Sequence, residues 1–135
     1  MPDLVPVAGD VYPTAVGSSM EMVVIGETVS DGDVLYYDSS LEKWYVCDCT
    51  DADKINAQRV AMVSGILDDS IPAIKPGAIF QIGAAIVKGG LYVLSEGGAI
   101  APSADLASLD NVVVVGVGAS TTEIEFSPWV TGYVY

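Results

Sequence analysis

The chain repeats one pattern of short apolar segments and turns twice within 135 residues. In each copy an apolar segment follows a turn, a short return segment and a polar excursion come next, and a Val-rich segment interrupted by glycine closes the copy. The segments span residues 32–37, 43–46 and 60–67 in the first copy, and 89–94, 97–101 and 112–117 in the second. Apolar runs of this length between turn residues predict β-strands. We therefore expect an all-β fold, a small β-barrel or β-sandwich with an internal two-fold pseudo-repeat.

Prolines and glycines divide the chain into three parts. Residues 1–20 contain three prolines and leave no room for a strand of normal length, so we expect an extended N-terminal arm. Residues 21–128 form the predicted barrel or sandwich domain. Residues 129–135 form an aromatic C-terminal tail, which Pro128 predicts to leave the barrel. Two prolines within 71–77 argue against a central strand there.

The excess of acidic residues makes a nucleic acid an unfavourable binding partner. Eighteen acidic and five basic residues give a net charge of −13, so the surface would repel the phosphates of a nucleic acid. The acidity keeps a Gly- and Val-rich β-protein soluble; attraction of a basic partner is the alternative interpretation. We see no secretory signal and no apolar run long enough for a membrane-spanning helix, so we expect no membrane partner.

Two cysteines, Cys47 and Cys49, are spaced two residues apart in a predicted strand. Their side chains would share one face, a spacing that suits a disulfide poorly. With no histidine in the chain, a four-ligand zinc site would need carboxylates. We expect two reduced thiols packed on one side of the strand, as in a protein made in a reducing cytoplasm.

The sequence offers little catalytic chemistry. A serine or cysteine nucleophile needs a nearby base, most often histidine, and there is none. Four carboxylate pairs lie at predicted turns or on a solvent-facing strand, where turn formation and solvation explain them: Asp31/Asp33, Asp51/Asp53, Asp68/Asp69 and Glu123/Glu125. We therefore expect no enzyme, no catalytic residues and no cofactor.

Two weaker alternatives remain open. Asp48, Asp51 and Asp53 could supply oxygen ligands to calcium, although their spacing does not match an EF-hand loop. A lipoyl- or biotin-carrier domain is also a small barrel with an internal repeat. Lys88 is the nearest candidate for its modified lysine, but the characteristic flanking residues are absent.

Apolar side chains near both ends are the candidate contact residues. Tryptophan and tyrosine are enriched at the centres of protein interfaces. The C-terminal aromatics could pack between molecules or fold back over the end of their own barrel. The candidates are Val5, Val7, Val11 and Tyr12 in the arm, and Trp129, Tyr133 and Tyr135 in the tail.

The second half also carries a recognisable series of motifs. They are Gly-Gly-Leu-Tyr-Val at 89–93, Gly-Gly-Ala-Ile at 97–100, Val-Val-Val-Gly-Val at 113–117 and Ile-Glu-Phe-Ser-Pro at 124–128. This series resembles the capsid decoration (cement or head-stabilising) proteins of tailed bacteriophages and some tail-associated proteins. Residues 26–67 have a similar pattern of strands and turns.

The resemblance implies a β-barrel or sandwich that binds the outside of a phage capsid, often as a homotrimer over a local three-fold axis. The partner would be the major capsid protein, and the arm would lie across capsid subunits. The chain would then be a structural virion protein on the capsid exterior, assembled in the host cytoplasm. The alternatives are a tail-fibre or receptor-binding module that recognises a host glycan or surface protein, and a cellular binding module.

Overall fold

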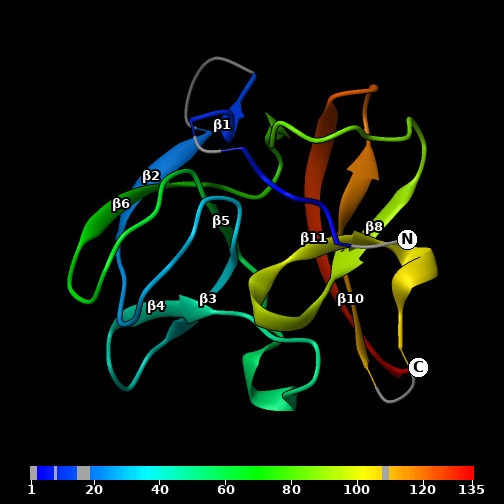
Figure 1. The fold of residues 1–135 in the computed structure, drawn as a ribbon. Coiled ribbons are helices and arrows are strands. Elements are labelled where there is room, and N and C mark those ends of the chain that lie inside the picture. Colours follow the sequence, from blue (N-terminus) through cyan, green and yellow to red (C-terminus); the bar gives the residue numbers. More distant parts are fainter. Residues whose placement is uncertain (1–2, 8, 15–18, 108–109) are drawn as a thin grey trace.

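The computed structural model describes residues 3–7, 9–14, 19–107 and 110–135. These residues form an all-β, sandwich-like fold of two antiparallel sheets that are not closed into a barrel. Figure 1 shows the sheets side by side, one built mainly from each half of the chain. The predicted fold class is confirmed, and the sandwich is the form that it takes.

The first half forms a five-stranded sheet in the order β2-β6-β5-β3-β4. The strands are β2 (Met20–Val24), β3 (Val34–Asp38), β4 (Lys43–Val46), β5 (Arg59–Ala61) and β6 (Ser70–Ile74). The sheet curls until its edge strands approach each other, where a single bridge joins Ile25, just after β2, to Trp44 of β4. The first half is thus a partly closed sheet.

The second half forms a six-stranded sheet in the order β1-β7-β11-β10-β8-β9. The strands are β1 (Tyr12–Pro13), β7 (Ile79–Gln81), β8 (Leu91–Leu94), β9 (Ile100–Pro102), β10 (Asn111–Gly118) and β11 (Glu123–Val134). Five of them come from the second half of the chain. The sixth, β1, comes from the N-terminal arm and adds to the edge of β7.

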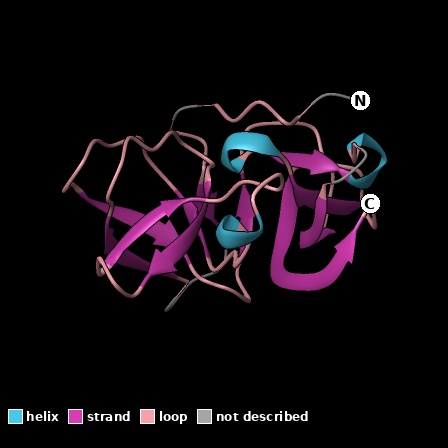
Figure 2. Cartoon of the chain, turned by 90° about the horizontal axis from the view of Figure 1, so that it is seen from below, coloured by secondary structure: helices cyan, strands magenta, loops and turns pink. Residues whose placement is uncertain are grey.

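The predicted repeat appears as one topology used twice. Without β1, the order β9-β8-β10-β11-β7 matches β4-β3-β5-β6-β2 strand for strand, and every pairing is antiparallel. Short 3₁₀ turns also match: η1 (Ala52–Lys54) precedes β5 and η3 (Ser103–Asp105) precedes β10. An additional turn, η2 (Glu96–Gly98), joins β8 to β9. Figure 2 shows the three turns between the strands. The two halves therefore share a five-strand plan.

One large apolar core joins the two halves. It includes Val34, Val60 and Ile74 from the first sheet and packs them with second-sheet residues such as Phe80 and Phe126, whose rings meet edge to face. A smaller cluster fills the concave face of the first sheet, and its members are Val23, Ile25, Val29, Leu35, Ala61, Ile71 and Ala73. The first sheet consequently has buried side chains on both faces.

One predicted strand is shorter in the structure than expected. The strand expected over 60–67 ends at Ala61, and Ile66 and Leu67 are exposed in the connection that follows. Beyond Ala61 the segment keeps only isolated backbone contacts, such as the bridge between Gly65 and Val29.

Proline 72 lies in a central strand, so the expectation of no central strand at 71–77 is wrong. It belongs to β6, which pairs with both β2 and β5. The Pro72 carbonyl accepts a hydrogen bond from the Met62 amide, 3.1 Å away, just beyond the end of β5. A residue in a strand directs its nitrogen and carbonyl to the same side, so the missing N–H falls where the β5 ladder has ended.

Candidate interaction surfaces

The N-terminal arm lies along the second half of its own chain. The amide of Leu4 donates to the carbonyl of Ile100 at 2.8 Å, and that of Val7 donates to Ile82 at 3.0 Å. Tyr12 and Pro13 then form β1 beside β7. The described residues of the arm make isolated backbone hydrogen bonds and a two-residue strand, as is typical of a segment that contains prolines.

One predicted contact residue of the arm is buried. Val11 is 2% exposed and belongs to the main core. Its side chain packs inside its own chain and is not available to a partner in this conformation. Val5, Val7 and Tyr12 are exposed and remain accessible.

The C-terminal aromatic segment continues a strand, so the expectation that it leaves the domain is wrong. Residues 129–134 belong to β11, and Val114 and Val113 of β10 pair with Trp129 and Val130. The ladder shifts register between Val114 and Gly116, opposite the segment that contains Pro128. Such a bulge accommodates a proline, which has no N–H for the ladder. Figure 2 shows the strand curving strongly toward the C-terminus.

Trp129 and Tyr133 lie on this strand, Tyr135 directly follows it, and all three side chains are exposed to solvent. Trp129, Tyr133 and Tyr135 are 64%, 75% and 64% exposed. They therefore do not cap the end of their own sandwich, which was one of the two interpretations of the sequence. The segment from Phe126 to Tyr135 has no charged side chain, so it offers an apolar surface on an acidic protein.

A second exposed apolar surface was not predicted. Met20, Met22 and Val24 alternate along β2 and are all exposed. The intervening side chains face inward, where Val23 packs in the smaller core and Glu21 forms an ion pair with Arg59. The period-two pattern of Met-Glu-Met-Val-Val was visible in the sequence, but it does not reveal which face is covered.

Most of the paired carboxylates have local partners. Asp51 accepts a hydrogen bond from the Asp53 amide at the start of η1, and Asp69 accepts one from the Ile66 amide, both at 2.9 Å. Asp68 forms an ion pair with Lys43. The contacts of Asp51 and Asp69 are the turn-stabilising roles expected from the sequence, whereas that of Asp68 joins two separate turns.

One carboxylate, Asp33, is perturbed. Burial raises its pKa to about 6, and the charges of Glu27 and Asp31 add to the effect, while a hydrogen bond from the Ser30 amide opposes it. Asp33 lies where the two halves meet, because a Cβ on Gly98 of η2 would lie 3.3 Å from the Asp33 Cβ. Burial deprives the charged carboxylate of solvating water, so ionised Asp33 is unfavourable at this position.

The two cysteines are reduced and buried, as expected. Burial raises the pKa of both thiols, that of Cys49 to about 12, and the nearby Asp110 adds to the shift at Cys49. Because the thiolate is the reactive form, both residues are poor nucleophiles near neutral pH.

One pocket of the structure is large enough to be considered as a small-molecule site. A pocket of about 320 Å³ carries amide and hydroxyl groups but no ionisable side chain, and is lined by Gln81, Gly83, Ala84, Ala85, Thr121 and Thr122. Within the described part of the chain, no three Cys, Asp or Glu residues are grouped to hold a metal ion, so Asp48, Asp51 and Asp53 do not form such a group. No helix among the same residues is long and apolar enough to cross a bilayer.

No protein-family model matches this sequence, and no curated protein does either.

Proposed function

We propose that this chain is a structural virion protein that binds the outside of a phage capsid and stabilises the lattice by bridging capsid subunits. Its partner would be the major capsid protein. It would lie on the exterior of the capsid, which assembles in the host cytoplasm. The proposal rests on the motif resemblance described above, together with the surfaces of the folded chain.

The observation that carries the proposal is the exposure of apolar side chains on ordered backbone. Six of the seven candidate contact residues are exposed, and they are Val5, Val7, Tyr12, Trp129, Tyr133 and Tyr135. Trp129 and Tyr133 lie on β11, which pairs with β10, and the Tyr135 amide donates to the Asp110 carbonyl at 2.8 Å, so little backbone entropy is lost when a partner covers these side chains. Large aromatic side chains presented in this way are typical anchors of protein interfaces.

The physical effect on a capsid follows from mass action. A protein that binds only the assembled shell stabilises that shell by its binding free energy. If several copies are joined, the linked contacts raise the effective affinity further. The resemblance implies a homotrimer for this role, which stays a prediction.

Heads that lack the chain, prepared from the phage or prophage that encodes it, provide the test. We expect the purified chain to co-sediment with them and to raise the temperature at which they rupture. Trp129→Ala combined with Tyr133→Ala should weaken binding at least tenfold, because two anchors of more than 1 kcal/mol are removed.

The matched control is Leu41→Ala combined with Leu67→Ala, which removes exposed apolar side chains elsewhere on the surface. This control should bind as the wild type does. Absence of binding to the heads would contradict the proposal, and equal loss in both double variants would contradict the role of the C-terminal aromatics.

A further inference from the structure

The two halves differ where β2 and its counterpart β7 end. The last residue of β2, Val24, pairs with β6, and the last residue of β7, Gln81, pairs with β11. The segments that follow begin with the same two residues, Ile-Gly, at 25–26 and at 82–83. Positions along these two segments can therefore be compared one by one.

In the first half a long connection covers this segment. The connection is residues 62–69, which link β5 to β6. The amides of Val29 and Gly65 each donate to the carbonyl of the other, at 2.9 and 3.0 Å, and the amide of Ile25 donates to the carbonyl of Asp69 at 3.0 Å. The connection therefore lies against the segment that follows β2.

In the second half the equivalent space is left open. The connection from β10 to β11 is shorter and comprises residues 119–122. It meets the segment after β7 where the Ile86 amide donates to the Thr121 carbonyl at 2.9 Å. Residues 84–85 are alanines, whereas the equivalent residues 27–28 are Glu-Thr. The shorter connection and the smaller side chains together leave the pocket of about 320 Å³ described above.

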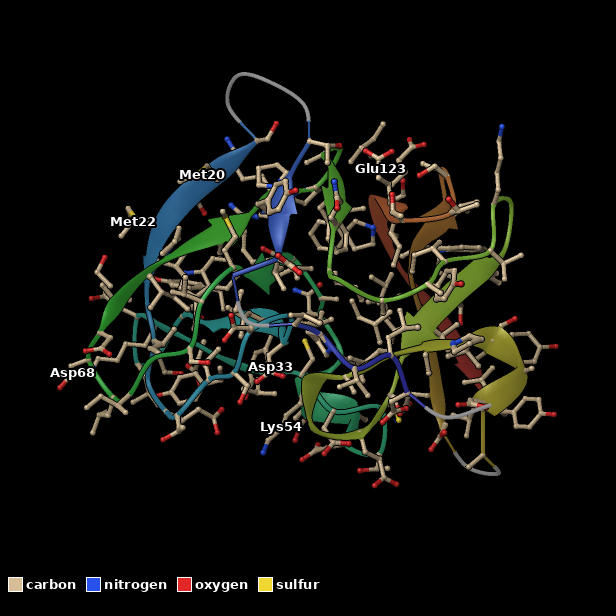
Figure 3. The ribbon with its side chains drawn as sticks, turned by 45° about the horizontal axis from the view of Figure 1, so that its top comes forward. Met20, Met22, Asp33, Lys54, Asp68 and Glu123 are labelled. Atoms are coloured by element: carbon tan, nitrogen blue, oxygen red, sulfur yellow. The ribbon has the colours of Figure 1, made fainter. Side chains whose placement is uncertain are left out.

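The backbone on both sides of this pocket is held in place. One side is pressed against the arm, since a Cβ on Gly83 would lie 2.7 Å from the Val7 Cβ. The other side is a tight turn in which the Ala119 amide donates to the Glu123 carbonyl at 2.9 Å. Figure 3 shows Glu123 at this end of the second sheet. A site fixed in this way loses little entropy when a ligand binds.

The charges near the pocket disfavour an anionic ligand. Glu123 directly follows the lining residues, and hydrogen bonds from the hydroxyls of Thr14 and Ser120 lower its pKa, so it is ionised at neutral pH. Asp10 is also close, because a Cβ on Gly83 would lie 3.1 Å from the Asp10 Cβ. An anion would meet these carboxylates on a chain whose net charge is −13.

The lining groups suit a neutral ligand that is rich in hydroxyl groups. The Gln81 amide and the hydroxyls of Thr121 and Thr122 can each donate and accept hydrogen bonds, as sugar hydroxyls do. The methyl groups of Ala84 and Ala85 offer a small apolar surface, which suits the C–H face of a ring better than a large apolar ligand. The volume of about 320 Å³ lies at the lower end of the range for ligand sites, so it suits a ligand of about one ring.

We propose that this pocket binds one residue of a neutral saccharide, with Gln81, Thr121 and Thr122 as the hydrogen-bonding partners of its hydroxyl groups. The site belongs to the second half, because the longer connection covers the equivalent place in the first. It lies at the opposite end of β11 from Trp129 and Tyr133, so it is separate from the surface proposed for capsid contact.

An NMR titration of the isotope-labelled full chain tests the proposal. The ligands are the methyl glycosides of glucose, galactose and mannose, together with N-acetylglucosamine. We expect at least one of them to shift the amide signals of residues 81–86 and 119–123 in a saturable way. The expected Kd is in the millimolar range, because the ligand has few heavy atoms. Sorbitol, which has hydroxyl groups but no ring, should give no saturable shifts.

Two substitutions should remove this binding. Gln81→Leu deletes the amide and Ala85→Phe fills the pocket, so each should weaken binding by about tenfold or more. Gln58→Leu and Ala52→Phe are the matched controls, because they make the same changes at a half-buried glutamine and an exposed alanine of the first half. Both controls should bind as the wild type does, and the amide signals outside the pocket show whether each variant is folded.

Three results would each overturn the proposal: no saturable shifts with any of the saccharides, shifts confined to other residues, or binding that survives both Gln81→Leu and Ala85→Phe. Tighter binding of a blocked dialanine peptide at the same residues would also overturn it, because the pocket would then be a peptide site. The inference does not rest on capsid binding. A chain that binds a saccharide here but ignores phage heads would support it while contradicting the proposed function.

Discussion

The two halves of this molecule follow the same five-strand plan but treat their edges differently. In the second half the arm covers the edge of β7, and β10 and β11 extend into a long, curved pair that presents aromatic side chains. In the first half the sheet curls around its own small core, and its edge strand β2 meets β4 at the bridge between Ile25 and Trp44. The repeated topology thus sets the core, while the edge strands decide which surfaces remain accessible to partners.

The largest effect is expected at the core that the halves share. Phe126→Ala should lower the free energy of unfolding by about 3–5 kcal/mol, because a fully buried ring is removed from the main cluster. Since this cluster spans both sheets, the halves should unfold together. Urea unfolding can be followed by Trp44 in a Trp129→Phe background and by Trp129 in a Trp44→Phe background.

Coincident transitions at the two tryptophans are expected for the parent proteins and for the Phe126→Ala variants. Separate midpoints, with the first half unchanged by the substitution, would show that the halves are independent units and that the shared core does not couple them.

A smaller effect is expected where the arm completes the second half. Val11→Ala should lower the free energy of unfolding by about 1.5–3 kcal/mol, because two buried methyl groups are lost and a small cavity remains. Val5→Ala makes the same change at an exposed arm position and should have almost no effect. Denaturant titrations measure both variants. If Val11→Ala changed the free energy of unfolding as little as Val5→Ala does, the arm would not dock on its own chain in solution.

The smallest effect concerns Asp33, at the junction of the halves. Its pKa is raised from 3.8 to about 6 on folding, so between these values the folded chain binds more protons at this group than the unfolded chain. Its contribution to the free energy of unfolding therefore grows as the pH falls toward 4 and is lost as the pH rises through about 6. Asp33→Asn should be more stable than the wild type at neutral pH by about 1–2 kcal/mol, a figure reduced for partial exposure.

This advantage should vanish near pH 4, and comparison of thermal unfolding at the two pH values measures it. An advantage that is the same at both pH values would contradict the assignment of the shift to Asp33.

Much of the fold was predictable because apolar runs and turn residues mark strands locally. Residues 34–37 and 91–94 became β3 and β8, and the polar excursions became the turns η1 and η3. The errors came from pairing between distant segments. Pro72 and Pro128 are acceptable in paired strands only because β5 ends beside the first and a bulge lies opposite the second.

The surfaces were harder to predict than the strands. The sequence identifies apolar residues near the ends of the chain, but not that Val11 is buried while Tyr133 is exposed. It also gives no sign that the arm pairs with β7 while β2 meets β4, because this depends on how distant segments come together. Burial is a property of the assembled sheets, whereas composition and periodicity describe one segment at a time.

The position of β11 between β7 and β10 has a consequence for biosynthesis. The first sheet consists entirely of residues 20–74, so it can form while the ribosome is still translating the rest. The second sheet has a gap at its centre until residues 123–134 emerge, and β1, made early, has to wait for β7. Nascent chains should therefore expose the unfinished second half until residues 123–134 have emerged, which makes this the stage at which a chaperone would matter most.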